Sequence, residues 1–305
     1  MIQSQSQKPL DRALNLSTLR RVLGKALIYA ILIIGAILVV GPFLWMLSTA
    51  LTPAMEVFSW PPRLIPETIM WENFAQASRE IRFPRLLLNS LIVSITATIS
   101  AVFLSALAGY ALAKLRFPGR TILFLFFLGT IMIPAQITMI PLFIMFRGFP
   151  LAGGNDILGN GGIGLLNSYS ALILPNLAST FGIYLMREFF RMLPSDLIDA
   201  ARVDGASEFK IFRRIMLPLA KPALSAVAIF NFTFVWNDFL WPLIMTTDPA
   251  MRTVQLGLSA FKGQYFTDWH LLMAATLMAS LPVLILYLVA QRHFIRGVAM
   301  SGMKG

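Results

Sequence analysis

Residues 196–222 read DLIDAARVDGASEFKIFRRIMLPLAKP, a polar stretch that lies between two long apolar runs. Asp199 falls in the first turn of a short helix, where the helix dipole favours negative charge. The pair Asp204-Gly205 predicts a sharp corner after this helix, because glycine tolerates the positive φ angle that other residues avoid. We expect a second short helix that Pro218 and Pro222 end, after which the chain enters the next apolar run. The stretch therefore predicts a helix–corner–helix unit.

This unit is half apolar. Its first helix carries Ala200 and Ala201, and its second helix presents Phe209 and Phe212. An apolar face that lies outside the lipid needs a protein partner to cover it. From these residues alone, a docking loop and a loop kept only for stability are both open interpretations.

The segments around the unit are strongly apolar. Of the 305 residues, 57% are hydrophobic and 13% are charged, whereas a soluble domain carries about 25% charged residues. Runs near or above the ~20 residues that cross a bilayer occur at 26–55, 86–113, 121–146, 157–186, 222–247 and 269–291. These runs predict an all-α integral membrane protein with six transmembrane helices. They exclude a soluble enzyme, and without alternating polarity they also exclude a transmembrane barrel.

The basic residues predict the orientation in the membrane. Eighteen of the 25 Lys and Arg residues lie in segments 1–25, 114–120, 187–221 and 292–305. Only seven lie in the remaining loops, 52–85, 147–168 and 247–268. By the positive-inside rule, both termini and the loop 187–221 are cytoplasmic. The net charge of +11 therefore reports topology, and we expect no nucleic-acid partner.

The segments give an expected division of the chain. We expect a cytoplasmic segment at 1–25, a first transmembrane helix at 26–51, an outer loop at 52–85, a core of five helices at 86–291 with the cytoplasmic loop 187–221, and a cytoplasmic tail at 292–305. The first helix is expected to be peripheral to the core.

Two runs have compositions with structural consequences. Residues 94–110 are rich in Ala, Ser, Thr and Gly, which allow close helix packing in lipid, so this helix is expected inside the bundle. The third run contains Pro134 and Pro141. Because unpaired backbone is not tolerated against lipid, we expect a kink or break there that lines a cavity.

Asp238 is the only acid within a predicted span, and intramembrane ionisable residues are candidates for function. With Trp236 and Asn237 it offers an aromatic platform and hydrogen-bonding groups, a chemistry that suits polyhydroxylated solutes. The alternative is that Asn237 and Asp238 satisfy a broken helix or contact a paired subunit. Both interpretations stay open.

Several chemistries lack the residues that they require. There is no Cys, and no Gly-x-x-x-x-Gly-Lys-Ser/Thr sequence that would cradle phosphate. A Gly-x-Gly-x-x-Gly sequence at 159–164 lacks a βαβ context, and His270 and His293 lack nearby partners at metal-ligand spacing. We therefore expect no cofactor, no metal site, no catalytic residue and an energy source in another polypeptide.

Four motifs occur together in this chain. They are Asp199-Ala-Ala-x-x-Asp-Gly-Ala206 with Phe212-Arg-Arg-Ile-x-Leu-Pro218, Phe181-Gly-Ile-Tyr-Leu-Met-Arg-Glu-Phe-Phe190, Trp236-Asn-Asp-Phe-Leu-Trp-Pro-Leu243, and Phe294-Ile-Arg-Gly-x-x-x-x-Gly-Met-Lys-Gly305. Together they resemble the carbohydrate-uptake branch of binding-protein-dependent ABC transporter permeases, specifically the maltose-type permease subunit with six spans and a MetI-like fold. One departure is Asp199, where the family usually has Glu in its EAA loop.

The resemblance implies partners and roles. It implies an ABC ATPase dimer, a second permease subunit in a heterodimer, a periplasmic or lipid-anchored solute-binding protein, and a bacterial plasma (inner) membrane. It implies that the coupling residues are Asp199 and Asp204 as polar or helix-end contacts, Ala200 and Ala201 for close approach, Gly205 for the turn, Phe209 and Phe212 for docking, and Pro218 at the helix end. Trp236, Asn237 and Asp238 are the candidates for the substrate path.

The expected function is half of an ATP-driven path for a sugar or sugar-like solute. The first alternative is an ABC permease for a non-sugar solute, such as a glycerol phosphodiester or a peptide. An intramembrane enzyme that uses Asp238 and a histidine lacks a second well-placed acid and a nucleophile motif. A passive channel would have no use for a docking loop.

Overall fold

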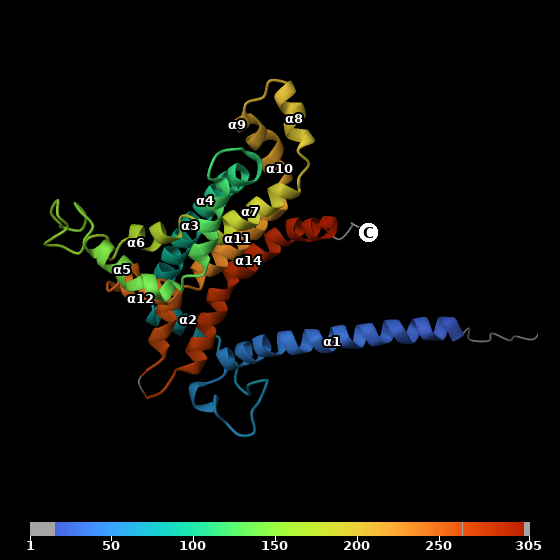
Figure 1. Cartoon of the computed structure of the whole chain (residues 1–305). Helices are drawn as coiled ribbons and strands as arrows, with labels where there is room; N and C mark the ends of the chain where they lie inside the picture. Colours follow the sequence, from blue (N-terminus) through green and yellow to red (C-terminus); the bar gives the residue numbers. More distant parts are fainter. Residues whose placement is uncertain (1–15, 264, 302–305) are drawn as a thin grey trace, which may run out of the picture.

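The computed structural model describes residues 16–263 and 265–301, and within them the chain is helical with no extended strand (Figure 1). The longest helices are α1 (Leu16–Leu51), α3 (Phe83–Lys114) and α14 (Trp269–Ser301), and α7 (Thr180–Met192) and α11 (Lys221–Trp236) pack against α3. Residues 1–15 of the expected segment 1–25 lie outside the described residues. Residues 302–305, at the end of the last motif, lie outside them too. The helix α14 continues past the expected boundary at Gln291.

The shorter helices connect or flank these five. They are α2 (Glu72–Glu80), α4 (Arg120–Ile131), α5 (Ala135–Arg147), α6 (Tyr169–Ile173), α8 (Asp196–Val203), α9 (Glu208–Ile211), α10 (Leu217–Leu219), α12 (Leu240–Met245) and α13 (Val254–Leu258). A π-helical turn, Phe212–Met216, joins α9 to α10. Short 3₁₀ turns occur at Ala54–Glu56, Leu174–Asn176, Pro249–Met251 and Ser259–Phe261.

Four helical segments are long and apolar enough to cross a membrane. They are Arg21–Leu51, Phe83–Lys114, Tyr169–Met192 and Trp269–Gln291. Two bent pairs, Arg120–Ile131 with Ala135–Arg147 and Glu208–Leu219 with Lys221–Trp236, bring the number to six if each pair is one span. The all-helical, multi-span class is confirmed, and six is the upper value that the structure allows.

The third predicted span is broken, as its prolines indicated. Helices α4 and α5 meet at 96°. Pro134 lies directly before α5 with φ −58° and ψ 131°, outside the helical region, whereas Pro141 lies inside α5. One proline therefore makes the break, and the second is accommodated within the helix.

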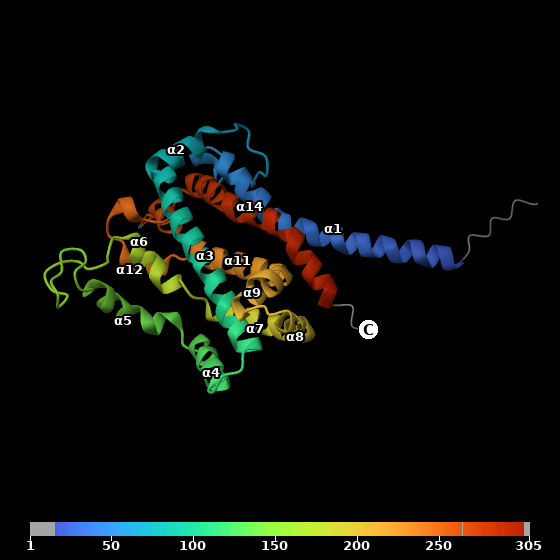
Figure 2. The same ribbon diagram turned by 90° about the horizontal axis from the view of Figure 1, so that it is seen from above.

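The predicted close packing of the second span is confirmed. A Cβ atom at Gly109 in α3 would lie 2.6 Å from the Cβ of Met186 in α7, and one at Gly182 would lie 2.4 Å from Ser105 Oγ. Real Cβ atoms essentially never lie this close to another atom. At Gly109 the neighbours include the Arg187 backbone nitrogen at 2.9 Å, so glycine is what lets α3 and α7 approach this closely there. Helix α3 consequently packs against both α7 and α11 (Figure 2), while Ile99 and Phe103 on its other side are exposed.

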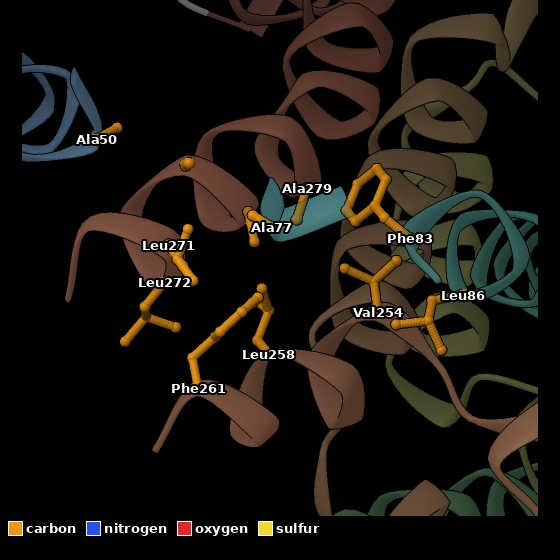
Figure 3. Packing of buried hydrophobic residues seen from close by; sticks show 12 residues of the cluster. Ala50, Ala77, Phe83, Leu86, Val254, Leu258, Phe261, Leu271, Leu272 and Ala279 are labelled. Carbon is orange, nitrogen blue, oxygen red and sulfur yellow. The ribbon is translucent and has the colours of Figure 1, made fainter. Parts of the chain in front are cut away.

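Helix α1 is peripheral, as expected. Its large apolar side chains from Val22 to Leu44 are 47–71% exposed, and it projects away from the bundle (Figures 1 and 2). Its last turn is anchored by Ala50, which is fully buried in a cluster formed with α2, α3, α13 and α14 (Figure 3). An exposed apolar surface of this length is suited to lipid.

Candidate functional site

The polar stretch that follows α7 folds as the predicted helix–corner–helix. Helices α8 and α9 extend beyond the ends of α3, α7 and α11 (Figure 1). Gly205 makes the corner with φ +73°, and no atom lies within 4 Å of the position that a Cβ would take there. Its backbone angle, and not crowding, is therefore what requires glycine. We call residues 196–219 the docking loop.

The second helix ends between the two prolines that the sequence named. It continues through the π-helical turn Phe212–Met216 and through Pro218 to Leu219. Pro222 lies in the first turn of α11, where the missing N–H of proline is tolerated. The helix breaks only at Ala220, and the segments on either side of that break meet at 77°.

The inner face of the docking loop packs against the bundle. Ile198 and Ala201 of α8 are buried together with Phe212. The Phe212 ring centroid lies 5.3 Å from that of Tyr110 in α3, and Tyr110 in turn lies 5.8 Å from Phe190 in α7. Phe212 and Ala201, which the sequence placed at a contact with a partner, therefore hold the loop to its own chain.

The outer face of the docking loop remains apolar and exposed. Phe209 is 63% exposed and Val203 is 88% exposed. Leu197 and Ala200 are also exposed, and they lie at three-residue spacing with Val203 on α8. We call these four residues the docking face. Sequence reasoning named Ala200 and Phe209 but missed Val203, which its position at the end of α8 could have indicated.

Charged residues bridge the corner of the docking loop. Arg202 Nη1 donates to Asp199 Oδ1 at 3.2 Å, and Arg202 Nε donates to Glu208 Oε1 at 2.8 Å. Asp204 is exposed and terminates α8. The carboxylate of Asp199 is thus paired within its own helix, and Glu208 closes the corner from the far side of Gly205.

Glu208 also reaches the bundle. The Tyr110 hydroxyl donates to Glu208 Oε2 at 2.8 Å. Burial acts to raise the pKa of the Glu208 carboxyl, but the hydrogen bonds from Arg202 and Tyr110 outweigh it and hold that pKa below its ordinary value. Sequence reasoning missed Tyr110 and Glu208, because no local pattern relates two residues that are 98 positions apart.

The substrate-path candidates lie at the break between α11 and α12. Trp236 is 2% exposed, and its Nε1 donates to the Ala279 carbonyl at 3.1 Å, so it packs the bundle. Asp238 Oδ1 accepts from the backbone N–H of Trp241 at 3.2 Å in the first turn of α12. The Trp236 bond joins α11 to α14. The Asp238 bond provides an acceptor for a backbone N–H at the start of α12, after the break.

Asn237 is the exposed member of the three candidates. Its Oδ1 accepts from Gln255 Nε2 of α13 at 3.1 Å. The two amides form a small polar group beside the half-buried Asp238. Gln255 was missed by sequence reasoning, since the outer loop that carries it gives no signal of its position.

The loops at the opposite end of α3 are held by one buried amide. Asn89 is fully buried, and its Nδ2 donates at 2.8 Å to the carbonyls of both Ala250 and Arg252. Its Oδ1 accepts from the Tyr169 hydroxyl at 2.7 Å. This amide therefore ties α3, α6 and the loop before α13 together.

Within residues 21–263 and 265–291, whose side chains the structure describes, no three His, Asp or Glu side chains lie close enough to hold a metal ion. The chemistry available in this part of the chain is hydrogen bonding, packing and charge pairing.

The comparisons with known proteins identify the family. Residues 101–300 match the family described as "Binding-protein-dependent transport system inner membrane component". The chain belongs to this family. The membership confirms the resemblance carried by the four motifs.

Relatives of known name agree with this family. The chain is 34% identical to the diacetylchitobiose uptake system permease protein NgcG of Streptomyces coelicolor, over 90% of this chain and 88% of the relative. It is 38% identical to the arabinooligosaccharides transport system permease protein AraQ of Bacillus subtilis, over 71% of this chain and 72% of the relative. It is 32% identical to the sn-glycerol-3-phosphate transport system permease protein UgpE of Yersinia pestis, over 90% of this chain and 95% of the relative. These relatives support the carbohydrate-type branch of ABC transporter permeases.

A solved structure shares the fold. The structure described as a bacterial ABC transporter involved in the import of the acidic polysaccharide alginate superposes with a TM-score of 0.74. The match covers 94% of this chain and 100% of the other at 22% identity. At this identity the likeness concerns the fold alone, which is that of an ABC importer permease.

Proposed function

We propose that this chain is the permease subunit of an ATP-driven importer and forms half of a path for a sugar or sugar-like solute. A second permease subunit supplies the other half. An ATPase dimer binds the docking loop, and its closure rocks the spans between inward-open and outward-open states. A periplasmic or lipid-anchored binding protein delivers the solute.

The observation that carries the proposal is the docking face. Leu197, Val203 and Phe209 are exposed on a segment that extends beyond the bundle. Exposed apolar groups at such a place mark a protein interface. The inner side of the same segment packs on α3 and α7, so a force on the docking face reaches the spans. A partner must supply the ATP site, because the sequence holds no Walker-type phosphate cradle.

The proposed solute class is supported by the names of two relatives and by the polar side chains at the break between α11 and α12. Two of the relatives are named for diacetylchitobiose and for arabinooligosaccharides. The Asn237 and Gln255 amides and the Asp238 carboxylate supply donors and acceptors of the kind that bind hydroxyl groups. A second candidate is a glycerol phosphate compound, favoured by the relatives named for sn-glycerol-3-phosphate.

The proposed topology follows the basic residues. The docking loop and both termini face the cytoplasm across a bacterial inner membrane, and the loops 52–85, 147–168 and 247–268 face outward. The Asn89 network then lies at the outer end of the bundle. In this arrangement the solute-binding protein meets the end opposite to the ATPase.

Purification of the tagged chain from its native membrane in mild detergent tests the proposal. Mass spectrometry should find an ATPase and a second permease at stoichiometric amounts. The ligand of the binding protein that belongs to the same importer then names the solute. Recovery of the intact chain alone, with solute turnover unaffected, would overturn the proposal in favour of a channel or an intramembrane enzyme.

A further inference from the structure

One side chain of the docking loop is bound from two sides. The Glu208 carboxylate accepts from the Tyr110 hydroxyl through Oε2 and from Arg202 through Oε1. Tyr110 belongs to α3 and is 4% exposed, whereas Arg202 belongs to α8. The carboxylate therefore joins a transmembrane helix to the helix that carries most of the docking face.

This connection is placed where α3 and the docking loop meet. Tyr110 lies one turn before the end of α3 at Lys114. The Lys114 ammonium donates to the Leu193 carbonyl at 2.6 Å, at the start of the segment that leads to α8. The last turn of α3 thus holds the loop at two points, one before α8 and one after the corner.

The hydrogen bonds made by Lys114 and Tyr110 differ in the kind of group that accepts them. The bond from Lys114 goes to a backbone carbonyl, and the contact of Tyr110 with Phe212 is apolar packing. Both hydrogen bonds have one ionised partner and are therefore charge-assisted, but only the bond from Tyr110 reaches a side chain beyond the corner. Through Glu208 it links Arg202 of α8 to α3, in addition to the packing of Ile198, Ala201 and Phe212.

We propose that Glu208 is a positioning residue that transmits movement of the docking loop to α3 through Tyr110. The inference rests on the proposed function, since it requires an ATPase that moves the docking loop. Without the bond, α8 still docks through its apolar outer face. Its movement then reaches α3 only through the apolar packing around Phe212, and part of it is taken up by the loosened corner.

The absence of cysteine from the sequence allows nitroxide reporters at single introduced cysteines. Lys210→Cys reports on the docking loop, and Thr96→Cys reports on an exposed position near the middle of α3. Each reporter is placed in the parent chain and in Tyr110→Phe, within the whole importer purified from native membrane. Spectra are compared without nucleotide and with ATP plus vanadate. Tyr184→Phe is the matched control, since the Tyr184 hydroxyl has no hydrogen bond within the described part of the chain.

In the parent and in Tyr184→Phe, we expect nucleotide to change the spectra at both reporters. In Tyr110→Phe, the response at Lys210→Cys should persist, and the response at Thr96→Cys should be clearly smaller than in the parent, because the polar link to α3 is lost while the ring packing remains. Glu208→Gln should also reduce the response at Thr96→Cys. When Tyr110→Phe and Glu208→Gln are combined, this response should fall no further than in the more affected single variant, because both changes remove the same bond. Equal responses at both reporters in the parent and Tyr110→Phe would overturn the inference.

Two other outcomes separate the inference from the proposed function. If Tyr110→Phe no longer retains the ATPase, the bond serves to shape the docking face, and the inference is overturned while the proposed function stands. If the parent importer shows no nucleotide response at Lys210→Cys, the docking loop is not moved by ATP, and both proposals fall.

Discussion

The hydroxyl of Tyr110 donates a 2.8 Å hydrogen bond to the carboxylate of Glu208 and so connects the buried helix α3 to the exposed docking loop. Around this bond, Phe190 and Phe212 form an aromatic cluster with the Tyr110 ring. The loop is therefore part of the packed bundle on its inner side, while its outer side stays free for a partner.

Replacing Gly205 by proline should abolish uptake and ATPase association. Proline requires a φ angle near −65°, and Gly205 has φ +73°, so the corner cannot form. Co-purification of the ATPase and solute uptake in cells measure the effect. The control is Gly129→Ala in α4, where a Cβ has open space. Normal uptake by a well-expressed Gly205→Pro variant would contradict coupling through this corner.

Replacing Phe209 by glutamate should weaken ATPase association by roughly tenfold or more, because a charge replaces an exposed anchor of the interface. Pull-down against a titration of the purified ATPase gives the affinity. Phe58→Glu is the control, since Phe58 is 79% exposed on the loop that the charge pattern places outside. Equal affinities for the two variants would argue against the docking face.

Asp238→Asn separates the charge of this residue from its hydrogen bond. The asparagine oxygen can still accept from the Trp241 N–H, so the thermal unfolding temperature should change little. If the carboxylate lies on the solute path, the transport rate or the solute preference should change. Rates and preferences equal to those of the wild type would leave Asp238 with a structural role only.

Asn89→Ala should destabilise the chain by about 2–4 kcal/mol, because the fully buried amide makes three hydrogen bonds, to the Ala250 and Arg252 carbonyls and from the Tyr169 hydroxyl, that alanine cannot make. Thermal unfolding in detergent measures the loss. Gln76→Ala is the control, since Gln76 bonds only the exposed Glu80 side chain and should change stability by about 0.5 kcal/mol or less. A loss no greater than that of the control would show that water replaces the amide.

The stabilising effect of Glu208 should depend on pH. Because the folded state lowers the pKa of this carboxyl, its contribution is fully present above the pKa of the unfolded chain and is lost as the pH falls through the folded pKa. The unfolding temperature of wild type should therefore exceed that of Glu208→Gln at neutral pH and approach it in acid. A difference that grows as the pH falls would contradict this assignment.

Local sequence was enough to predict much of the fold and of the loop. Pro134 predicted the break between α4 and α5, and the small residues near Gly109 predicted close packing of this helix against its neighbours. Asp204-Gly205 predicted the corner of the docking loop. In each case the cause is local, since it lies in the backbone freedom or the size of the residues themselves.

Other features depended on contacts between distant segments. Phe212 and Phe209 look alike in sequence, yet Phe212 is buried against α3 and Phe209 is 63% exposed. Their three-residue spacing puts them on neighbouring sides of a helix, but it does not say which side meets the bundle. Pro218 and Pro222 were expected to end a helix, and the break lies between them at Ala220, after a π-helical turn that the sequence did not predict.

By itself, the sequence determined a multi-span helical membrane protein with a polar docking loop, because hydropathy, charge and glycine placement act residue by residue. Only the tertiary structure decided that Tyr110 meets Glu208, that Asn237 meets Gln255, and that Trp236 packs the bundle. These pairs come from segments 98, 18 and 43 positions apart. Their contacts follow from how whole helices pack, a property that no local pattern contains.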